Sequence, residues 1–386
     1  MYVESLTFAG SLLLVAGSAA GCIYLLYACV LVRRFAARHR PRPANARPVS
    51  VLKPLCGEDP GLFDNLSSFC RQDYPTWQIV FGVQDANDPA IAVVQRLGAA
   101  FPEADLALVV ERGRSEGNLK VANLQNMLPA ARHELIVIAD SDMRVAPDYL
   151  ALVTAPLADP ALGLVTCLYR GLPAGGFWSQ LASLHVNHGF LPQALVAEAL
   201  GAGAGCFGAT LALRRDTLEA IGGLAAIADA LADDHALGAA VRRIGRKVVL
   251  SPYIVDNIIA EPNFRALFRH ELRWARTIRS LAPAGFMGSV VTQPIILALA
   301  AVALGALPVI APAMLAASIV SRLAMVRVVD RALGLAPTPL SLIALRDLLS
   351  FAVFVASFFI RTVAWRDRTF RIGPKGRLIL DGDSPA

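Results

Sequence analysis

The sequence predicts an α/β protein that is anchored in a membrane near both ends of the chain and carries a mostly parallel sheet in between. Hydrophobic residues make up 55% of the 386 residues and charged residues only 17%, whereas an average soluble domain has about 25% charged residues. The apolar residues gather in long uncharged blocks near both ends. The segment between these blocks alternates short apolar runs with helical patterns,. These two observations together indicate the fold class.

The first apolar block, from Phe8 to Val32, contains no charged residue, and about 20 apolar residues are enough for a helix to span a bilayer. Basic residues follow at 33–47, which indicates that this side of the membrane is the cytoplasm. A cleaved signal peptide is the alternative, but its basic residues would precede the block, where Glu4 is the charged side chain,. We therefore expect residues 1–47 to form a signal-anchor transmembrane helix and a basic linker.

Two further apolar blocks lie at 288–320 and 339–360. The first is too long for one straight span and barely long enough for two, and Gly305 and Pro308 are suited to break it into a hairpin. The stretch at 321–336 carries three arginines, which favours an interfacial amphipathic helix. We expect transmembrane or re-entrant helices over 287–364 and a basic cytoplasmic tail over 365–386, with the parity of the spans left open.

Short apolar runs in the middle segment are typical of buried strands, and several are followed by polar or acidic residues. These runs lie at 49–52, 78–83, 106–110, 135–139 and 162–168. Helical patterns at 62–70, 90–97 and 119–128 separate the first strands, and this alternation predicts a parallel sheet covered on both faces. In such sheets, ligands bind beyond the carboxyl ends of the strands.

Charge and cysteine content narrow the classes of partner. The net charge of +6 comes largely from basic clusters beside the apolar blocks, which favours anionic lipid headgroups over nucleic acid. The sequence carries no signature of an RNA- or DNA-binding module. The six cysteines form no Cys-x-x-Cys pair, so a zinc site or a disulfide framework is not expected.

Acidic residues after two predicted strands are candidates for a catalytic site. Asp140 and Asp142 follow the strand at 135–139, and two carboxylates at this spacing are suited to hold a divalent cation that also binds a diphosphate. Asp85 follows the strand at 78–83. Both patterns also occur in ordinary turns, which Asp side chains commonly cap.

Two polar pairs each admit a functional and a structural interpretation. Lys120 and Asn123 suit contacts to a phosphate and a base, or the solvated start of a helix. Asp233 and Asp234 could include a general base, or could be acidic residues that favour the N-terminus of a helix because of its dipole.

Taken together, these segments resemble the ceramide glucosyltransferase-like family of inverting glycosyltransferases, which have the GT-A fold. The matching segments cover nearly the whole chain and lie at 49–55, 72–75, 83–85, 120–123, 139–142, 232–234, 273–274 and 365–370. Within the family, the segments at 79–85, 163–171 and 270–277 are most similar to the bacterial hopanoid-biosynthesis-associated glycosyltransferases. Such enzymes are understood to transfer N-acetylglucosamine from UDP-N-acetylglucosamine to bacteriohopanetetrol.

The resemblance implies a role for each candidate residue. Asp234 would be the catalytic base, and Asp140 with Asp142 would hold Mg²⁺ or Mn²⁺ on the diphosphate. The residues that would bind the nucleotide sugar are Lys53, Pro54, Asp85, Lys120, Asn123 and Asp140.

A second group of residues would bind the diphosphate and close the acceptor site, namely His270, Arg273 and Trp274. His270 stands where the family has Gln or Arg. An imidazole can donate a hydrogen bond as Gln does, so we expect the role to be kept and the strength of the bond to depend on pH. Trp274 is alternatively an aromatic anchor at the membrane interface. Secondary candidates are His188, Cys206 and Asp233.

The resulting hypothesis is a multi-pass enzyme of the bacterial inner membrane with a GT-A domain at 48–286 facing the cytoplasm. The donor would be a UDP-sugar, and the closeness of Arg273 and Trp274 to an apolar block favours a membrane lipid as acceptor. Other candidates are a ceramide or diacylglycerol β-glucosyltransferase that uses UDP-glucose, a processive polysaccharide synthase, and a non-catalytic membrane protein that binds nucleotide sugars. Neither the sugar nor the lipid is determined by the sequence.

Overall fold

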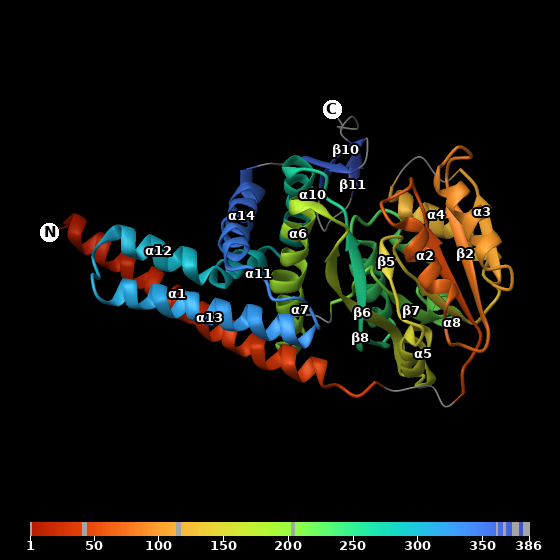
Figure 1. Cartoon of the computed structure of the whole chain (residues 1–386), viewed down its shortest axis with the longest axis horizontal. Coiled ribbons are helices and arrows are strands. Elements are labelled where there is room, and N and C mark those ends of the chain that lie inside the picture. The colour runs from red at the N-terminus through yellow and green to blue at the C-terminus, as the bar shows by residue number, and fades with distance from the viewer. Residues whose placement is uncertain are drawn as a thin grey trace. The chain divides into compact units, whose positions relative to one another are not determined.

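The computed structural model describes residues 2–40, 45–112, 117–201, 205–359, 362–365, 368–372 and 378–380. The chain forms two compact units (Figure 1). The helical unit comprises Met1–Arg38, Leu184–Leu200 and Phe264–Ala364, and the sheet unit comprises His39–Ser183, Gly201–Asn263 and Trp365–Ala386.

The sheet unit is built on an eight-stranded mixed sheet with the strand order β3-β2-β1-β4-β7-β6-β8-β5. Its strands are β1 (Val49–Pro54), β2 (Trp77–Val83), β3 (Leu106–Val110), β4 (Leu135–Ile138), β5 (Met143–Arg144), β6 (Leu162–Pro173), β7 (Leu211–Arg214) and β8 (Lys247–Ile259). The first four strands run parallel to one another, β7 is antiparallel to β4 and β6, and β8 is parallel to β6 but antiparallel to β5. The mostly parallel sheet predicted from the sequence is confirmed.

Helices cover both faces of this sheet. They are α2 (Leu62–Cys70), α3 (Ala90–Ala100), α4 (Leu119–Met127), η1 (Leu128–Ala130), α5 (Tyr149–Thr154), η2 (Ala155–Ala158), α6 (Gly176–His185), α8 (Arg215–Ala220), η4 (Leu224–Ile227) and α9 (Asp233–Arg243), and the last residues of α6 fall in the helical unit. The predicted helix at 62–70 is confirmed at both ends.

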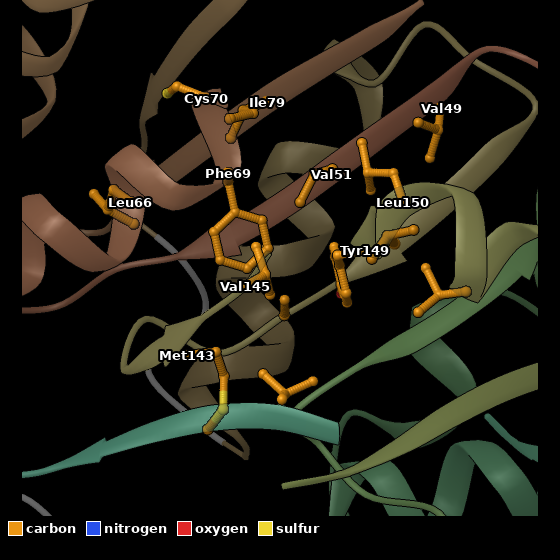
Figure 2. Close-up of a cluster of buried hydrophobic side chains, with 14 of the residues drawn as sticks. Val49, Val51, Leu66, Phe69, Cys70, Ile79, Met143, Val145, Tyr149 and Leu150 are labelled. Carbon is orange, nitrogen blue, oxygen red and sulfur yellow. The ribbon is translucent and has the colours of Figure 1, made fainter. Parts of the chain in front are cut away.

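Alternate residues of the strands enter two separate hydrophobic cores, because successive side chains of a strand point to opposite faces of the sheet. Val51 and Phe81 pack with side chains of α2, α3 and α5, among them Phe69 (Figure 2). Leu52 and Val80 pack with side chains of α4, α8 and α9 on the other face. The near-continuous apolar strands of the sequence therefore follow from burial on both faces.

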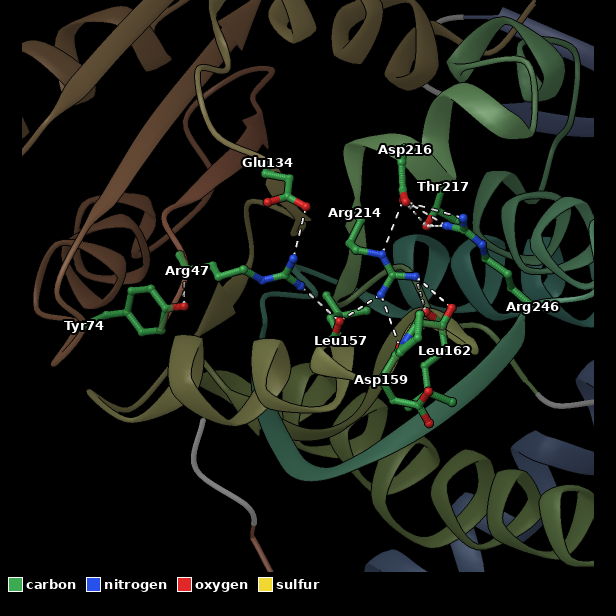
Figure 3. Close-up of polar contacts among 11 residues, drawn as sticks. Arg47, Tyr74, Glu134, Leu157, Asp159, Leu162, Arg214, Asp216, Thr217 and Arg246 are labelled. Atoms are coloured by element: carbon green, nitrogen blue, oxygen red, sulfur yellow. Dashed lines mark hydrogen bonds and ion pairs between the residues drawn. The ribbon is translucent and has the colours of Figure 1, made fainter. Parts of the chain in front are cut away.

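Arginine side chains hold the sheet edge at which β4 and β6 begin. Arg214 is only 5% exposed and donates hydrogen bonds to the carbonyl oxygens of Leu157 and Leu162, each at 2.8 Å (Figure 3). Arg47 binds Glu134 at 3.0 Å and the Leu157 carbonyl oxygen at 3.0 Å. These bonds satisfy backbone carbonyl groups in the turn before β6 and leave the opposite edge, with the carboxyl ends of the strands, to other side chains.

The helical unit contains the long apolar helices. Its elements are α1 (Tyr2–Ala36), η3 (Val186–Phe190), α7 (Leu191–Ala199), α10 (Phe264–Leu281), α11 (Pro283–Gly288), η5 (Ser289–Thr292), α12 (Pro294–Leu304), α13 (Ile310–Ala332) and α14 (Leu340–Phe359). Within the described residues, three helices are long and apolar enough to span a membrane, at Val3–Ala36, Ile310–Ala332 and Leu340–Phe359. The pair Pro283–Thr292 and Pro294–Leu304, bent by 68°, would make a fourth span if it crosses as one.

The apolar block at 288–320 breaks where the sequence predicts. Gly305 adopts a left-handed φ of 70° after α12, and α13 begins at Ile310. The predicted separate interfacial helix at 321–336 is wrong, because residues 321–332 continue α13. The reason is tertiary, since Arg322 is buried in an ion pair with Asp347 of α14 instead of facing a headgroup layer.

Near the C-terminus, β9 (Thr362–Trp365), β10 (Arg368–Ile372) and β11 (Leu378–Leu380) form a three-stranded sheet in the order β11-β10-β9. The other residues of the predicted basic tail, at 366–367, 373–377 and 381–386, lie outside the described part of the chain.

Small residues allow α1 to pack closely within the helical unit. The Ser18 hydroxyl lies 2.9 Å from the Pro294 carbonyl oxygen and 2.8 Å from the Ser318 hydroxyl. A Cβ atom on Gly21 would lie 2.2 Å from the Val291 carbonyl oxygen. Close approach of helices at small residues is a common way of packing in membranes.

We expect Gly21→Ala to destabilise the helical unit by about 1–3 kcal/mol, because the added methyl group overpacks against backbone. Gly10→Ala is the matched control in the same helix, since its Cβ would lie at an ordinary 3.6 Å from Leu304. Thermal unfolding of the detergent-solubilised variants measures the difference. Equal unfolding temperatures for the two variants would contradict the packing described here.

Candidate active site

Asp140 and Asp142 lie in the turn between β4 and β5, at the carboxyl end of a central strand. The parallel register of β1 with β4 brings the end of β1 to the same edge, where the Lys53 ammonium donates a hydrogen bond to the Asp140 carbonyl oxygen. From β8, Asn257 Nδ2 donates to Asp142 Oδ2 at 2.7 Å, and the N–H of Ile258 donates to the Asp142 carbonyl oxygen at 2.9 Å. The acidic turn is therefore held from two directions.

Lys120 lies in the first turn of α4 and joins two acidic segments. The helix starts here because the Asn118 carboxamide oxygen accepts the N–H of Lys120 at 2.9 Å and caps the N-terminus,. Lys120 Nζ then lies 2.6 Å from Asp140 Oδ1 and 3.2 Å from Asp233 Oδ2. A single ammonium group thus connects the ends of β4 and α9.

Asp233 and Asp234 form the first turn of α9, where the helix dipole favours negative charge,. Asp234 Oδ1 accepts the N–H of His235 at 2.7 Å, and Oδ2 accepts the N–H of Gly208 at 2.9 Å. Asp234 differs from its neighbour in that backbone N–H groups orient its carboxylate, whereas Asp233 pairs with Lys120.

Gly208 shows that Asp140 and Asp234 lie close to the same point. A Cβ atom added at Gly208 would lie 3.1 Å from Asp140 Oδ2, 3.4 Å from Lys120 Nζ and 3.6 Å from Asp234 Oδ2. A side chain at this position would fill the space between the two carboxylates. The backbone of Gly208 keeps that space available.

The four carboxylates of this cluster outnumber its two ammonium groups, so the formal charge is −2. Burial, and secondly the charge of Asp233, raise the pKa of Asp234 well above its ordinary value. Burial, and secondly Asp140, likewise raise the pKa of Asp142. The cluster therefore favours an added cation or proton.

The two lysines respond differently to this environment. Burial lowers the pKa of Lys53 to about 7 despite the nearby Asp140 and Asp142. Burial also disfavours the charged form of Lys120, but Asp140 and Asp233 together outweigh it and raise its pKa. Lys120 is thus the cation that the acids hold in place.

The other predicted nucleotide-sugar residues lie in three different settings. Lys53 is fully buried, with its ammonium 3.9 Å from the centroid of the Phe69 ring, so it supports the acidic turn from beneath. Pro54 is half-buried at the end of β1. Asn123 is buried, and its Nδ2 donates to the Gly82 carbonyl oxygen at 2.8 Å, which links α4 to β2.

Asp85 is exposed after β2, and its carboxylate accepts the N–H of Asn87 at 2.9 Å within the same loop. The buried Asn123 Oδ1 has no hydrogen-bond partner among the described residues. Buried acceptors of this kind are normally satisfied, so this atom is suited to a ligand or a water molecule.

The predicted diphosphate and acceptor residues lie on α10 of the helical unit. Trp274 packs edge-on against His270, with ring centroids 4.5 Å apart, and stacks on His185 at 6.1 Å. Burial lowers the pKa of His185 to about 4, so this imidazole is neutral near pH 7. Arg273 is half-buried one helical turn from His270.

Of the secondary candidates, Asp233 belongs to the acidic cluster. Cys206 is buried beside Gly238 of α9. A Cβ atom added at Gly238 would lie 2.8 Å from the Cβ atom of Cys206. His188 is buried in the π-helical turn η3, with its Nε2 2.7 Å from Asp330 Oδ1. These two side chains have packing and hydrogen-bonding roles in the structure.

Asp140 and Asp142 fit a divalent metal that is shared with a diphosphate. Magnesium usually takes one or two carboxylates together with substrate phosphate oxygens. In the described part of the chain, no group of three or more His, Cys, Asp or Glu side chains is arranged as a complete metal site. The donor set therefore suits an ion that completes its coordination with substrate.

The residues missed by sequence reasoning are Gly208 and Asn257. Gly208 lies before the short strand β7, and Asn257 lies in the thirteen-residue strand β8. A glycine next to a strand and one of several polar residues inside a strand are weak signals. Only the pairing of β5 with β8 places Asn257 opposite Met143, next to Asp142.

The sequence pattern of glycosyl transferase family 21 matches residues 13–378. The chain belongs to this family. The family resemblance predicted from the sequence is thereby confirmed.

Curated relatives match over shorter regions. Ceramide glucosyltransferase 1 of Caenorhabditis elegans is 26% identical over 271 residues, which cover 68% of this chain and 58% of the relative. An N-acetylglucosaminyltransferase of Rhizobium meliloti (strain 1021) is 24% identical over 251 residues, which cover 62% of this chain and 56% of the relative. The chain thus spans little more than half the length of these curated relatives.

The solved structure of a mannosyltransferase from Pyrobaculum calidifontis, in complex with GDP-Man and Mn²⁺, superimposes with a TM-score of 0.54. Its sequence is 19% identical, and the match covers 92% of this chain and 98% of the mannosyltransferase. The similarity confirms the predicted GT-A fold.

We expect Asn257→Leu to weaken the binding of Mn²⁺ in the presence of UDP by about tenfold or more, the usual range when a hydrogen bond to a metal ligand is removed. Titration calorimetry or the Mn²⁺ spin-resonance signal measures the affinity without any turnover. The control is Asn126→Leu, since Asn126 is half-buried outside the acidic cluster, where its amide donates to the Glu111 carbonyl oxygen at 3.0 Å. Unchanged Mn²⁺ affinity in Asn257→Leu would argue against Asp142 as a ligand.

Proposed function

We propose that this protein is an inverting glycosyltransferase that moves a sugar from a UDP-sugar to the hydroxyl group of a membrane lipid. The observation that carries the proposal is the convergence of Asp140 and Asp234 on the backbone of Gly208 in a chain of glycosyl transferase family 21. One carboxylate is suited to a metal on the diphosphate and the other to a proton from the acceptor.

Asp234 is the proposed base. Its raised pKa suits proton transfer, because a general base works best when its pKa lies near the operating pH,. It would take the proton from the acceptor hydroxyl as that oxygen attacks the anomeric carbon on the face opposite UDP. An α-linked donor would then give a β-linked product without a covalent intermediate on the protein.

Asp140 and Asp142 would hold Mg²⁺ or Mn²⁺, which when bound supplies positive charge at the diphosphate as UDP leaves. Asn257 would orient Asp142, and Lys120 would offset part of the charge of Asp140 and Asp233. Stabilisation of charge that develops in the transition state is usually the largest contribution to such catalysis.

By resemblance to the family, we propose that further residues contact the sugar donor and the lipid acceptor. Lys53, Pro54, Asp85 and Asn123 belong to the segments proposed to bind the nucleotide, and His270, Arg273 and Trp274 to the segment proposed to bind the diphosphate and close the acceptor site. The buried state of Lys53 favours an indirect role through the Asp140 turn.

A lipid acceptor is supported by the setting of α10. This helix ends at Leu281, and the bent apolar pair Pro283–Thr292 and Pro294–Leu304 follows at once. The acidic residue of α10, Glu271, is buried and pairs with Arg346 in the apolar helix α14. We therefore infer that His270, Arg273 and Trp274 lie at headgroup level, with the sheet unit on the cytoplasmic side of a bacterial inner membrane.

We favour bacteriohopanetetrol as the acceptor and N-acetylglucosamine as the sugar. The support is the resemblance of the segments at 79–85, 163–171 and 270–277 to the hopanoid-associated glycosyltransferases. Transfer of glucose to ceramide is the second candidate, which the matches to ceramide glucosyltransferases favour. Mass spectrometry of lipids from cells with and without the protein separates the two. Loss of a hexose from sphingolipids with unchanged hopanoids would exclude our first choice.

We expect Asp234→Asn to lower kcat by about 10²–10⁴-fold, because a positioned general base typically contributes this much. The assay is UDP release by the purified protein with UDP-sugar, Mg²⁺ and lipid. Asp105→Asn is the control, since Asp105 is an exposed carboxylate that pairs with Arg132 before β3. Undiminished release by Asp234→Asn would exclude Asp234 as the base.

We expect kcat to rise with pH, with an inflection well above the ordinary carboxyl pKa of about 4. The rate rises with pH because Asp234 accepts a proton only in its ionised form, and this form is lost as the pH falls through the raised pKa of Asp234. The measurement compares the pH profile of the wild type with that of the residual activity of Asp234→Asn. We expect the inflection to be absent from the profile of the variant. A wild-type profile that is flat between about pH 5 and 8 would contradict the assignment.

A further inference from the structure

The helical unit buries two ion pairs that meet at adjacent residues of α14. Arg346 Nη1 and Nη2 bind Glu271 Oε1 and Oε2 at 2.6 and 2.7 Å, which makes a bidentate pair with α10. Arg322 of α13 binds Asp347, with Nη2 at 2.6 Å from Oδ1 and Nε at 3.0 Å from Oδ2. Neighbouring positions of one helix thus hold two different helices.

The first pair is withdrawn from solvent almost completely. Glu271 is 4% exposed and Arg346 is 1% exposed, and Arg346 Nε also donates to the Ser350 hydroxyl at 3.1 Å. Apolar side chains of similar size would often hold two helices equally well, because desolvation offsets much of the attraction in a buried ion pair. Ionised residues inside apolar helices are uncommon and usually serve a function.

Glu271 is also unusual within its own helix. The sequence of α10 contains five arginines and one acidic residue, which is Glu271. Arginines at spacings of three and four residues repel one another along a helix. The single carboxylate nevertheless binds a guanidinium group of α14. It attaches the cationic helix α10 to the apolar helix α14 through an ion pair, and the Arg279 guanidinium of α10 also lies over the Phe358 ring of α14, 5.3 Å from its centroid.

The attachment point lies beside the residues proposed to bind the diphosphate and acceptor. An α-helix turns by about 100° per residue, so Glu271 flanks the stripe formed by His270, Arg273 and Trp274. Leu267, one turn earlier on the same flank, is also buried. On the stripe itself, Trp274 contacts the rings of His270 and His185. A rotation of α10 about its axis would require Glu271 to leave Arg346.

We propose that Glu271 and Arg346 are a positioning pair that sets the rotation of α10 and thereby presents Arg273 and Trp274 in their working orientation. The pair acts through these residues and touches neither substrate. This inference rests on the proposed transferase function, since it assigns a task to the same segment. The bidentate geometry suits the task, because two parallel hydrogen bonds fix orientation as well as distance.

The experiment compares Glu271→Gln, Arg346→Gln and the double variant with Asp347→Asn in the full-length protein. Asp347→Asn is the matched control, because it breaks a second buried pair at the next residue of α14, and that pair holds α13 instead of α10. We expect Glu271→Gln to lower kcat for transfer to lipid at least tenfold. We expect Asp347→Asn to keep kcat within twofold of the wild type. Both variants are expected to lower the unfolding temperature by similar amounts.

The double variant provides the second test. Two residues that act as one unit give non-additive effects, so we expect the double variant to lose no more kcat than the worse single variant. Multiplied losses in the double variant would overturn the pair as a unit. Equal losses of kcat in Glu271→Gln and Asp347→Asn would overturn positioning in favour of general loosening of the fold. Glu271→Gln with kcat within twofold of wild type would also overturn it.

Hydrogen exchange separates a failure of this inference from a failure of the proposed function. We expect Glu271→Gln to accelerate amide exchange in α10 at 264–281, and Asp347→Asn to accelerate it in α13 near Arg322. Absence of UDP release by the wild type with every UDP-sugar and lipid tested would overturn the transferase function. Unchanged exchange of α10 in Glu271→Gln would overturn the positioning pair in either case.

Discussion

The acidic site depends on one half-buried cation, the ammonium group of Lys120, which binds Asp140 and Asp233 at 2.6 and 3.2 Å. Three elements meet there: the end of β4, the first turn of α4 and the first turn of α9. Without a counter-ion, four carboxylates around one space would repel one another and would take up protons. Lys120 offsets part of the charge of the two carboxylates that it touches, and the backbone N–H groups of Gly208 and His235 orient Asp234. The neighbouring acids Asp233 and Asp234 thus have different tasks because their partners differ.

The helical unit solves a related problem with the same chemistry. Its apolar helices contain Arg322, Arg346 and Asp347, which would be costly in a hydrocarbon layer if each stood alone. Each is paired within the unit, and Arg322 also donates to the His188 carbonyl oxygen at 2.9 Å in the π-helical turn η3. The ion pairs therefore connect α10, α13, α14 and η3. The charges that interrupt the apolar blocks of the sequence are the points at which helices of this unit are attached to one another.

Much of the sheet unit follows from local pattern. The strands β1 to β4 were predictable because a strand buried on both faces is a short apolar run, and α2 because its apolar positions recur at helical spacing,. The acids at the ends of β4 and α9 were predictable as candidates from their motifs. The strands β7 and β8 were not predicted, since β7 has only four residues and β8 alternates between buried and half-buried positions. Residues 321–332 suggested an interfacial helix because arginine spacing does not reveal that Asp347 lies opposite Arg322.

The sequence by itself determined the α/β class with apolar helices long enough to span a membrane, the break at Gly305, the family, and the acidic residues that are candidates for the site. These features depend on composition, on periods of two and 3.6 residues, and on motifs, all of which are local. Only the tertiary structure decided that Asn257 orients Asp142, that Gly208 keeps space between Asp140 and Asp234, and that Lys53 is buried under the acidic turn. It also decided that residues 184–200 join α10 in the helical unit. The physical reason is that hydrogen bonds and ion pairs act over a few ångströms in space, and partners that lie 26 to 115 residues apart leave no periodic trace in the chain.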